Sequence, residues 1–283
     1  MEIIEIVKAV LIGIIQGITE WLPVSSTGHM ILFDEFVKLD VSEEFMDFFL
    51  VSIQLGSILA VLVLFFAKLN PFSRTKTKEE QKKTYSLWLH IIVGCLPAAV
   101  IGVLLEDWID ALFYRSDYAY VVVALALLIY GIAFILIEWY RKKSKSQNRV
   151  ETVESIGYRD ALLIGCFQVL ALIPGTSRSG STVLGACLLG VARPAAAEFS
   201  FFMAMPVMAG ASLLKGLKFV SQGAGMSVNE IGVLIVGTIT AFAVSLVAIR
   251  FLMDFVRRHS FAVFGWYRVV LSIAVLSYFS LAR

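Results

Sequence analysis

Charged residues are scarce in this chain of 283 residues. Asp, Glu, Lys and Arg make up 16% of it, and hydrophobic residues make up 59%. Soluble domains have about 25% charged and about 45–50% apolar residues. The mean hydropathy of +0.83 points the same way. The composition therefore excludes an ordinary soluble domain, gives no reason to expect a nucleic-acid partner, and predicts an all-α polytopic membrane protein.

Cysteine is also rare, and a basic N-terminal start is missing. Cys95, Cys166 and Cys187 lie in apolar stretches without the spacing of metal ligands, so we interpret them as small core residues. The chain begins with Glu2 and Glu5 among apolar residues, whereas a secretory signal begins with basic ones. We therefore expect no cleavable signal. The net charge of +2 is small, so the positions of Lys and Arg matter more than their sum.

The apolar runs fall into long and short ones, because a helix needs about 20 apolar residues to cross a bilayer. Six runs are long enough to be full transmembrane helices: 45–66, 87–105, 119–139, 199–217, 231–252 and 261–281. Four runs are shorter and form two pairs: 6–22 with 30–37, and 161–173 with 183–191. We expect each short pair to be re-entrant, entering the membrane and returning to its own side.

The chain is polar between Gln16 and His29, where its surroundings are apolar. Gln16 and Glu20 are four residues apart and share a face of a helix, which Pro23 then ends. The hydroxyl side chains that follow are those of Ser25, Ser26 and Thr27. Such groups are costly to place inside a membrane, so they are functional candidates by default.

A second polar stretch repeats the first. Residues 9–16 read AVLIGIIQ, and residues 161–168 read ALLIGCFQ. A proline and a hydroxyl-rich loop follow in both places, with a one-residue slip at the prolines. The polar residues of the second loop are Thr176, Ser177, Arg178, Ser179 and Thr182. We therefore expect two repeats, residues 1–150 and 151–283, within one integral membrane domain.

The number of spans predicts how the repeats are oriented. Each half has three full spans, an odd number, so the second half should be inverted relative to the first. The links 68–83, 140–160 and 253–260 are rich in Lys and Arg, which places them inside. The acidic link 106–118, the link 218–230 and both termini should then lie outside.

Inverted repeats with broken helices bind their substrates near the membrane midplane, where the repeats meet. We expect the two polar loops to enter from opposite faces and meet there. Each loop precedes a short helix, whose N-terminus presents free N–H groups and the positive end of a dipole. Together with Arg178, this donor set suits an anion with several oxygens, such as a phosphate.

The residues of the first loop allow several roles. Glu20 is a candidate general base or metal ligand, and a purely structural ion pair with Arg178 is the alternative. Gln16 can orient Glu20 or bind through its carbonyl oxygen. Ser26 and His29 are three residues apart, so on a helix they can form a nucleophile and its base. At least one of the hydroxyl residues should cap the helix that begins near Ser26.

These motifs resemble those of the bacterial undecaprenyl-diphosphatases of the bacitracin-resistance type. The resemblance covers essentially the whole chain. It rests on Gln16-x-x-x-Glu20, Pro23-Val-Ser-Ser-Thr-Gly-His29, Ser52-Ile-Gln-Leu-Gly-Ser-Ile-Leu-Ala60, Pro174-Gly-Thr-Ser-Arg-Ser-Gly180 and Glu198-Phe-Ser-Phe201. The first motif of the family begins with Glu or Gln. Because this chain has Gln16, the role of a base at that position cannot be transferred to it.

The resemblance implies a hydrolase of the bacterial cytoplasmic membrane. It would convert undecaprenyl diphosphate to the monophosphate at the outer face, recycle the carrier lipid of peptidoglycan synthesis and confer bacitracin resistance. It implies Glu20, Ser26, His29 and Arg178 as catalytic residues, and a divalent metal ion, Mg²⁺ or Ca²⁺, for which we assign Glu20 as a ligand. We expect substrate contacts from Gln16, Ser25, Thr27, Thr176, Ser177, Ser179 and Thr182. The expected partners are the polyprenyl diphosphate lipid and the membrane, and a homodimer is left open.

Other functions fit part of the pattern. An inverted-repeat transporter or flippase of anions or lipid phosphates would share the broken helices and the midplane site, but it has no need of a Ser/His/Glu set. A lipid phosphatase of the acid-phosphatase-like membrane superfamily would need a histidine soon after its arginine, and after Arg178 the next histidine is His259. A purely structural membrane protein has no use for two polar breaks.

Overall fold

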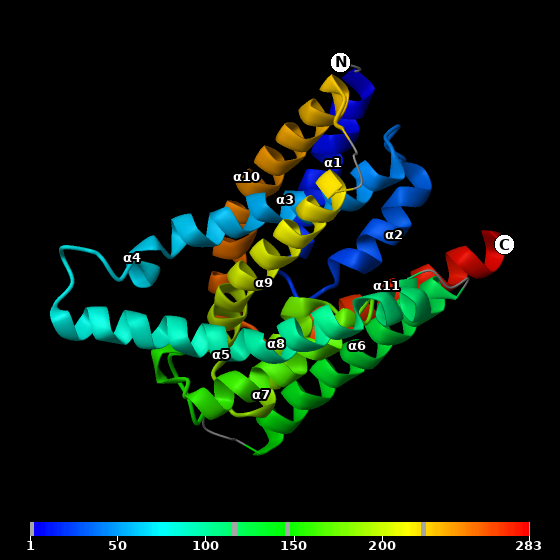
Figure 1. The fold of residues 1–283 in the computed structure, drawn as a ribbon. Coiled ribbons are helices and arrows are strands. Elements are labelled where there is room, and N and C mark those ends of the chain that lie inside the picture. The colour runs from blue at the N-terminus through cyan, green and yellow to red at the C-terminus, as the bar shows by residue number, and fades with distance from the viewer. Residues whose placement is uncertain (1–2, 115–117, 145–147, 222–224, 283) are drawn as a thin grey trace.

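Helices make up the regular structure of this chain. The computed structural model describes residues 3–114, 118–144, 148–221 and 225–282. These ranges contain no β-strand, and only an isolated bridge joins Val150 to Val191. The elements (Figure 1) are α1 Ile3–Thr19, α2 Ser26–Phe36, α3 Glu43–Leu64, α4 Phe66–Leu69, α5 Lys78–Ile109, η1 Asp110–Tyr114, α6 Ala119–Ser144, η2 Val153–Ser155, α7 Tyr158–Val169, η3 Leu170–Leu172, α8 Arg178–Leu188, α9 Arg193–Ser221, α10 Val228–Arg258 and α11 Ala262–Ala282. The predicted all-α class is confirmed.

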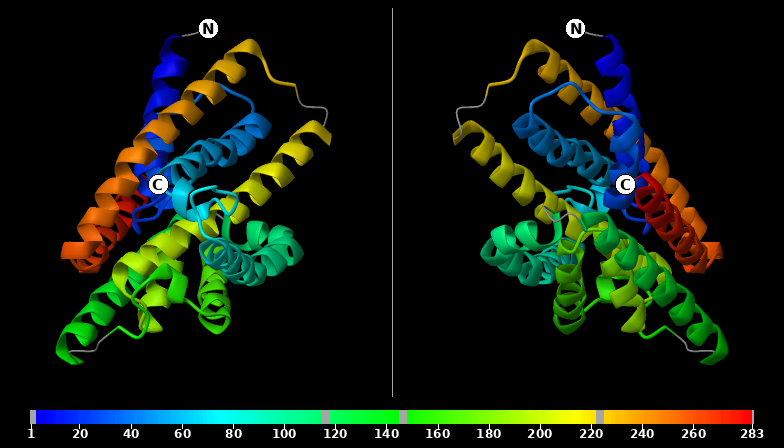
Figure 2. Two further views of the ribbon diagram at one scale, coloured as in Figure 1. Left: turned by 90° about the vertical axis from the view of Figure 1, so that its left-hand side faces the viewer. Right: turned by 90° about the vertical axis from the view of Figure 1, so that its right-hand side faces the viewer.

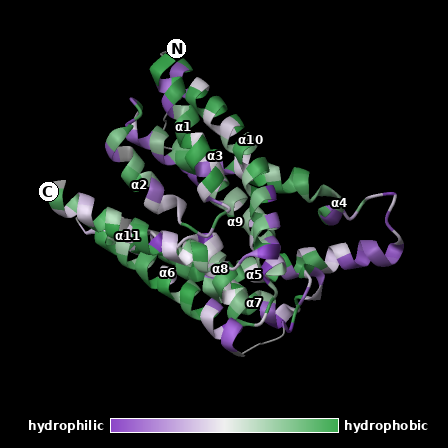
Figure 3. Cartoon of the chain, turned by 180° about the vertical axis from the view of Figure 1, so that it is seen from behind, coloured by the Kyte–Doolittle hydropathy of each residue, from purple (hydrophilic) through white to green (hydrophobic). Residues whose placement is uncertain are grey.

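Six of the described helices are long and apolar enough to cross a membrane: α3, α5, α6, α9, α10 and α11. Each matches one of the six predicted spans, with at most two residues of the span outside the helix, so this prediction is confirmed. Figure 3 shows their apolar lengths and the polar start of α5. This helix begins nine residues before the predicted span at 87, because Thr77 caps it: the Glu80 amide donates to Thr77 Oγ1 at 3.3 Å.

The short helices form the two predicted pairs. Helices α1 and α2 are joined by a turn at residues 20–25, and α7 and α8 are joined by η3 and residues 173–177. Helix α8 begins at Arg178, five residues before the predicted start at 183, because the Ser177 side chain caps it. The return of each pair to its own side of the membrane stays a prediction.

The two halves of the chain exchange helices. Helix α1 packs against α10, and α7 packs against α5, while α3 packs on α9 and α6 on α11 (Figures 1 and 2). An added Cβ at Gly13 would lie 2.7 Å from the Gly237 carbonyl oxygen, and one at Gly165 would lie 2.1 Å from that of Gly94. The aligned glycines therefore make equivalent close helix contacts, as a pseudo-twofold axis requires. The boundary at residue 150 and the inverted orientation stay predictions.

Polar contacts gather the basic links at one end of the bundle. Lys68, just after α3, pairs with Glu154 at 2.9 Å and with Glu198 at 2.7 Å. The Arg193 Nε donates to Glu138 Oε1 at 2.8 Å, and the same oxygen accepts from the amide of Phe261 at 3.2 Å. These contacts hold the connections after α3, α6 and α10 together, as the predicted topology requires.

Different connections meet at the other end. Glu5 Oε2 accepts a hydrogen bond from the Asp40 amide at 3.0 Å, and Ser42 Oγ donates to Glu230 Oε1 at 3.3 Å. The start of α1, the link after α2 and the start of α10 therefore lie together. Residues 115–117 of the acidic link are outside the described residues. Which end faces the cytoplasm stays a prediction.

Candidate active site

Two turns with the same strained backbone form the site. Among the described residues, Ser25 and Ser177 are the non-glycine residues with positive φ, at 75° and 70°. Such conformations cost about 1–3 kcal/mol each and cluster at functional sites. Ser25 Oγ accepts from the Gly28 amide at 3.2 Å, and Ser177 Oγ accepts from the Gly180 amide at 3.1 Å. The predicted cap near Ser26 is therefore Ser25, and its counterpart repeats the geometry.

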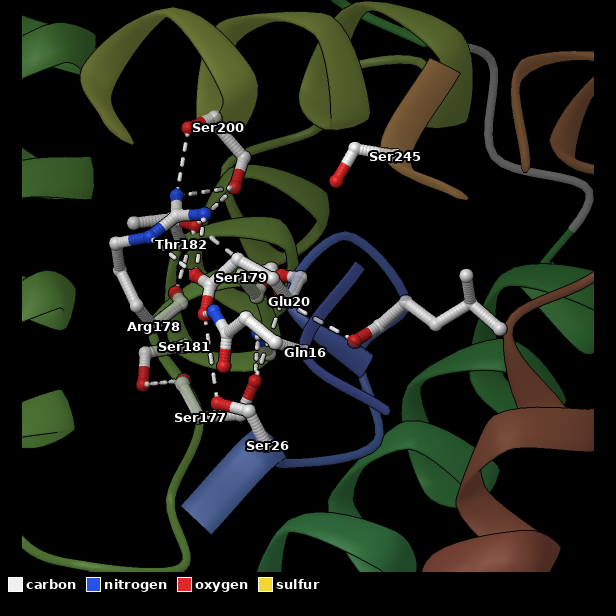
Figure 4. A network of polar contacts seen from close by, with 12 residues as sticks. Gln16, Glu20, Ser26, Ser177, Arg178, Ser179, Ser181, Thr182, Ser200 and Ser245 are labelled. Atoms are coloured by element: carbon white, nitrogen blue, oxygen red, sulfur yellow. Dashed lines mark hydrogen bonds and ion pairs between the residues drawn. The ribbon is translucent and has the colours of Figure 1, made fainter. Parts of the chain in front are cut away.

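The two turns touch through Glu20 and Arg178. Arg178 donates to Glu20 Oε1 from Nη2 at 3.1 Å and from Nε at 3.4 Å. The Ser179 hydroxyl is within reach of two carbonyl oxygens of the first turn, that of Glu20 at 3.0 Å and that of Leu22 at 3.3 Å. Figure 4 shows Glu20, from the turn between α1 and α2, beside Arg178 and Ser179 at the start of α8. The prediction that the two polar loops meet is confirmed.

The second oxygen of Glu20 joins the residues of the first motif. Gln16 Nε2 donates to Glu20 Oε2 at 3.0 Å, and Ser26 Oγ donates to the same oxygen at 3.4 Å. Glu20 is only 6% exposed, so its charge depends on these donors and on Arg178. The four-residue spacing of Gln16 and Glu20 thus gives the contact that it predicts.

Helix α9 holds the other side of the Arg178 guanidinium. Nη1 donates to the carbonyl oxygen of Ser200 at 2.8 Å and lies 3.4 Å from its hydroxyl, which in turn lies 2.7 Å from Thr182 Oγ1. The guanidinium also lies over the ring of Trp21, 5.8 Å from its centroid. Arg178 is therefore fixed as a planar fork rather than as a loose point charge.

Among the described residues, both ring nitrogens of His29 hydrogen-bond to groups other than Ser26, so the predicted hydrogen bond between His29 and Ser26 is not formed in this structure. Its Nδ1 lies 2.7 Å from the Ser25 carbonyl oxygen, and its Nε2 lies 2.6 Å from the hydroxyl of Tyr267. A carbonyl only accepts, so we assign the proton to Nδ1, and Nε2 accepts from Tyr267. These two partners occupy both ring nitrogens, and the Ser26 hydroxyl bonds to Glu20 instead.

The other predicted substrate contacts also lie in or beside the two turns. Ser25, Thr176, Ser179 and Thr182 are at most 2% exposed, and Thr27 is half-buried. Ser25 and Ser177 cap helices, and Thr182 bonds to Ser200. In the structure these side chains shape the turns, so any substrate contact from them stays a prediction.

The sequence analysis missed three residues of this region. Ser200 lies inside the Glu198–Phe201 motif that was noted only for its resemblance. Tyr267 and Arg268 belong to the last predicted span. Arg268 is a basic residue within an apolar run, and such a residue is a functional candidate by itself. That signal was present in the sequence.

The site suits one particular kind of metal binding. The described residues contain no group of three or more His, Cys, Asp or Glu side chains that could hold an ion. Mg²⁺ is usually bound through about one or two carboxylates together with substrate phosphates and waters. Glu20, the carbonyl oxygen of Gln16 and the hydroxyl of Ser26 are oxygen donors of this type. They fit a cation that bridges to phosphate, and they do not form a complete protein cage.

The chain is similar to known proteins over nearly its whole length. Residues 9–274 match the family described as bacitracin resistance protein BacA, so both turns lie inside the match. The chain belongs to this family. It is 56% identical over 280 residues to undecaprenyl-diphosphatase 1 of Clostridioides difficile, an alignment that covers 99% of this chain and 98% of the relative. It is also 52% identical over 271 residues to the undecaprenyl-diphosphatase of Enterococcus faecalis, with 96% of each chain covered.

A third relative extends the match to the full length. The chain is 52% identical over 280 residues to the undecaprenyl-diphosphatase of Acetivibrio thermocellus, with 99% of this chain and 100% of the relative covered. The bacitracin resistance family and the six apolar helices together make this protein a multi-pass membrane protein of a bacterial family. The resemblance seen in its motifs is confirmed.

Proposed function

We propose that this protein hydrolyses undecaprenyl diphosphate to undecaprenyl phosphate and inorganic phosphate. The observation that carries the proposal is the contact of Glu20 with both Ser26 and Arg178, at the junction of two strained turns that each begin a helix. Three relatives with 52–56% identity bear the name undecaprenyl-diphosphatase. By recycling the carrier lipid of the cell wall, the protein would confer resistance to bacitracin.

Arg178 is the group that binds the headgroup in this proposal. Its fork, now on Glu20 and Ser200, matches the geometry of two phosphate oxygens. When a diphosphate takes the place of Glu20, the carboxylate is released from its strongest donor and becomes a better base. The N-termini of α2 and α8 add free amide groups that favour an anion.

Ser26 is the proposed nucleophile and Glu20 its base. The Ser26 oxygen attacks the terminal phosphorus, its proton passes to Glu20 Oε2, and the bond from that phosphorus to the bridging oxygen breaks. Undecaprenyl phosphate leaves, and water then cleaves the phosphoserine to release phosphate. This assignment replaces His29 with Glu20 as the proton acceptor, because Ser26 contacts Glu20 in the structure. His29, held by Tyr267, is left to position the α2 turn or to protonate the leaving group.

A divalent cation, Mg²⁺ or Ca²⁺, is part of the proposal. Glu20 and the Gln16 carbonyl oxygen would hold it beside the phosphates. When bound, it would neutralise part of the charge that the phosphoryl oxygens carry in the transition state. We further propose that the site opens to the outer face of the cytoplasmic membrane. In this orientation the links rich in Lys and Arg lie on the cytoplasmic side. A homodimer stays a prediction.

Phosphate release from purified protein tests the proposal. Protein in detergent micelles with undecaprenyl diphosphate should release phosphate, and a chelator should stop the release until Mg²⁺ or Ca²⁺ is restored. The Ser26→Ala protein is the matched control for a contaminating phosphatase. Wild-type protein that binds the lipid and releases no phosphate would contradict the proposal and favour a transporter, a function that no relative reported above is named for.

A further inference from the structure

Arg268 on α11 lies directly behind the second turn. Its side chain is completely buried. Nη2 donates to the carbonyl oxygen of Gly175 at 2.8 Å and to that of Thr176 at 2.6 Å. Gly175 has a φ of 88°, a conformation that glycine adopts without strain. One guanidinium group therefore fixes the backbone that leads to Arg178.

The rest of the Arg268 guanidinium has no hydrogen-bond partner among the described residues, although it lies over the Tyr130 ring, 5.4 Å from the ring centroid. Nε and Nη1 make no hydrogen bond, and no described carboxylate pairs with the side chain. Nη1 faces the first turn of α8, because a Cβ added at Gly180 would lie 2.7 Å from it and 3.2 Å from the Ser177 Cβ. A buried cation beside the positive end of a helix is unfavourable unless a negative charge comes near.

The charges of the site show what this arginine adds. Glu20 and Arg178 cancel each other, so the pair alone leaves the two turns neutral apart from the helix dipoles. Arg268 adds a full positive charge behind the same turn. A diphosphate headgroup carries more than one negative charge at neutral pH. The site therefore matches the charge of this headgroup better with Arg268 than without it.

Helix packing does not explain the arginine. Helices α6 and α11 cross at Gly131 and Gly265, and a Cβ added at either glycine would lie within 2.8 Å of the other's carbonyl oxygen. Arg268 follows Gly265 by three residues, as Phe134 follows Gly131 on the other helix. Phe134 is also fully buried. The equivalent position thus accepts an apolar side chain, so the crossing itself has no need of a charge.

We propose that Arg268 is a positioning residue of the headgroup site, which holds the backbone before Arg178 and supplies the net positive charge that binds a diphosphate. This inference rests on the proposed function for its substrate. It predicts that two properties can be separated at one position. The charge should set the affinity for diphosphate, and Nη2, which donates to two carbonyl oxygens, should set the rate of turnover.

Two substitutions separate these properties. Arg268→Gln removes the charge. Arg268→Lys keeps it, but the shorter lysine side chain cannot place its ammonium group where Nη2 donates to the two carbonyl oxygens. The probe is inorganic diphosphate with Mg²⁺ in excess, and its dissociation constant is taken from the thermal shift of purified protein. We expect Arg268→Gln to weaken this binding about 10- to 100-fold, the effect of losing a charged donor. Arg268→Lys should bind diphosphate nearly as well as wild type but lose about 100-fold in kcat, because Arg178 is misplaced.

Arg258→Gln is the matched control, because Arg258 is exposed at the end of α10 and its loss changes the net charge equally. The Arg258→Gln protein should keep the wild-type diphosphate affinity and the wild-type kcat. Should neither Arg268 variant fold, Gly180→Ala displaces Nη1 without changing the charge, and we expect it to lower kcat. Wild-type diphosphate affinity in a folded Arg268→Gln protein, or wild-type turnover in Gly180→Ala, would overturn the proposal. If the wild-type protein releases no phosphate but Arg268→Gln still loses diphosphate affinity, the proposed reaction fails and the anion-binding role of Arg268 stands.

Discussion

At the scale of single residues, the pair of Glu20 and Arg178 connects the two repeats across 158 positions of sequence. Their side chains are 7% and 11% exposed. Removing one partner of a buried pair costs about 3–5 kcal/mol, because the other charge is left alone. Variants of either residue therefore need a stability measurement beside each activity measurement.

Substitution of Arg178 should show that its shape matters as much as its charge. We expect Arg178→Lys and Arg178→Ala each to lose about 100- to 1000-fold in turnover, the usual cost of one transition-state donor. Arg178 bonds to Glu20 and Ser200 through different nitrogens of its planar group, and the single ammonium group of lysine cannot reach both partners. Phosphate release by folded protein measures this, and a Lys variant within a few-fold of wild type would contradict it.

Ser25 should contribute to stability, and the neighbouring Ser26 should contribute to turnover. Ser25 accepts the capping hydrogen bond of α2, so Ser25→Ala should lower the free energy of unfolding by about 1 kcal/mol. Ser26 donates to Glu20, so Ser26→Ala should keep its stability and lose turnover. Thermal unfolding and phosphate release on both variants compare the two. Near-normal turnover in Ser26→Ala, with His29→Ala inactive, would remove serine as the nucleophile.

Residue spacing predicted part of this site and failed on another part. Gln16 and Glu20 meet as their spacing indicates, because Glu20 directly follows α1 and its amide still donates to the Gln16 carbonyl oxygen at 3.0 Å, as in a helix. The spacing of Ser26 and His29 was equally favourable, yet the ring bonds to Tyr267, which is 238 residues away. A local pattern shows which side chains share a face of a helix. It does not show which distant side chain competes for them.

At the scale of helices, apolar runs located the spans but not their ends. Helix α5 starts at Lys78 because a threonine caps it, and α8 starts at Arg178 because Ser177 does. Both caps lie outside the apolar runs that hydropathy detects. The positive φ of Ser25 and Ser177 could not be predicted, because a residue other than glycine rarely adopts it.

The close helix crossings predict a contrast between two glycines. In Gly165→Ala the new Cβ would lie 2.1 Å from the Gly94 carbonyl oxygen, so α7 and α5 must separate. We expect a loss of about 1–3 kcal/mol, as for other overpacked cores. Gly210 on α9 has nothing within 4 Å, so Gly210→Ala should be neutral or slightly stabilising. Thermal unfolding in detergent measures both, and equal stability of the two variants would contradict this packing.

At the scale of the whole molecule, the exchange of helices makes each half depend on the other. The first half cannot cover α1 without α10, and the second cannot cover α7 without α5. The aligned glycines of the sequence predicted two repeats, and in the structure these glycines lie at close contacts between helices. The exchange of helices between the halves could not be predicted from the sequence, because the same pattern of spans would also allow each half to pack alone.

The last prediction concerns the sides of the membrane. The connections after α3, α6 and α10 share one end of the molecule through the Lys68 and Glu138 contacts, and because these connections are rich in Lys and Arg we expect that end to face the cytoplasm. Single cysteines at exposed Thr75 and Asn229, after Cys166→Ser has removed the exposed native thiol, mark the two ends. In intact cells a membrane-impermeant maleimide should label Thr75→Cys only after permeabilisation and Asn229→Cys at once. Labelling of Thr75→Cys in intact cells, with Asn229→Cys protected, would reverse the orientation and place the links rich in lysine and arginine outside.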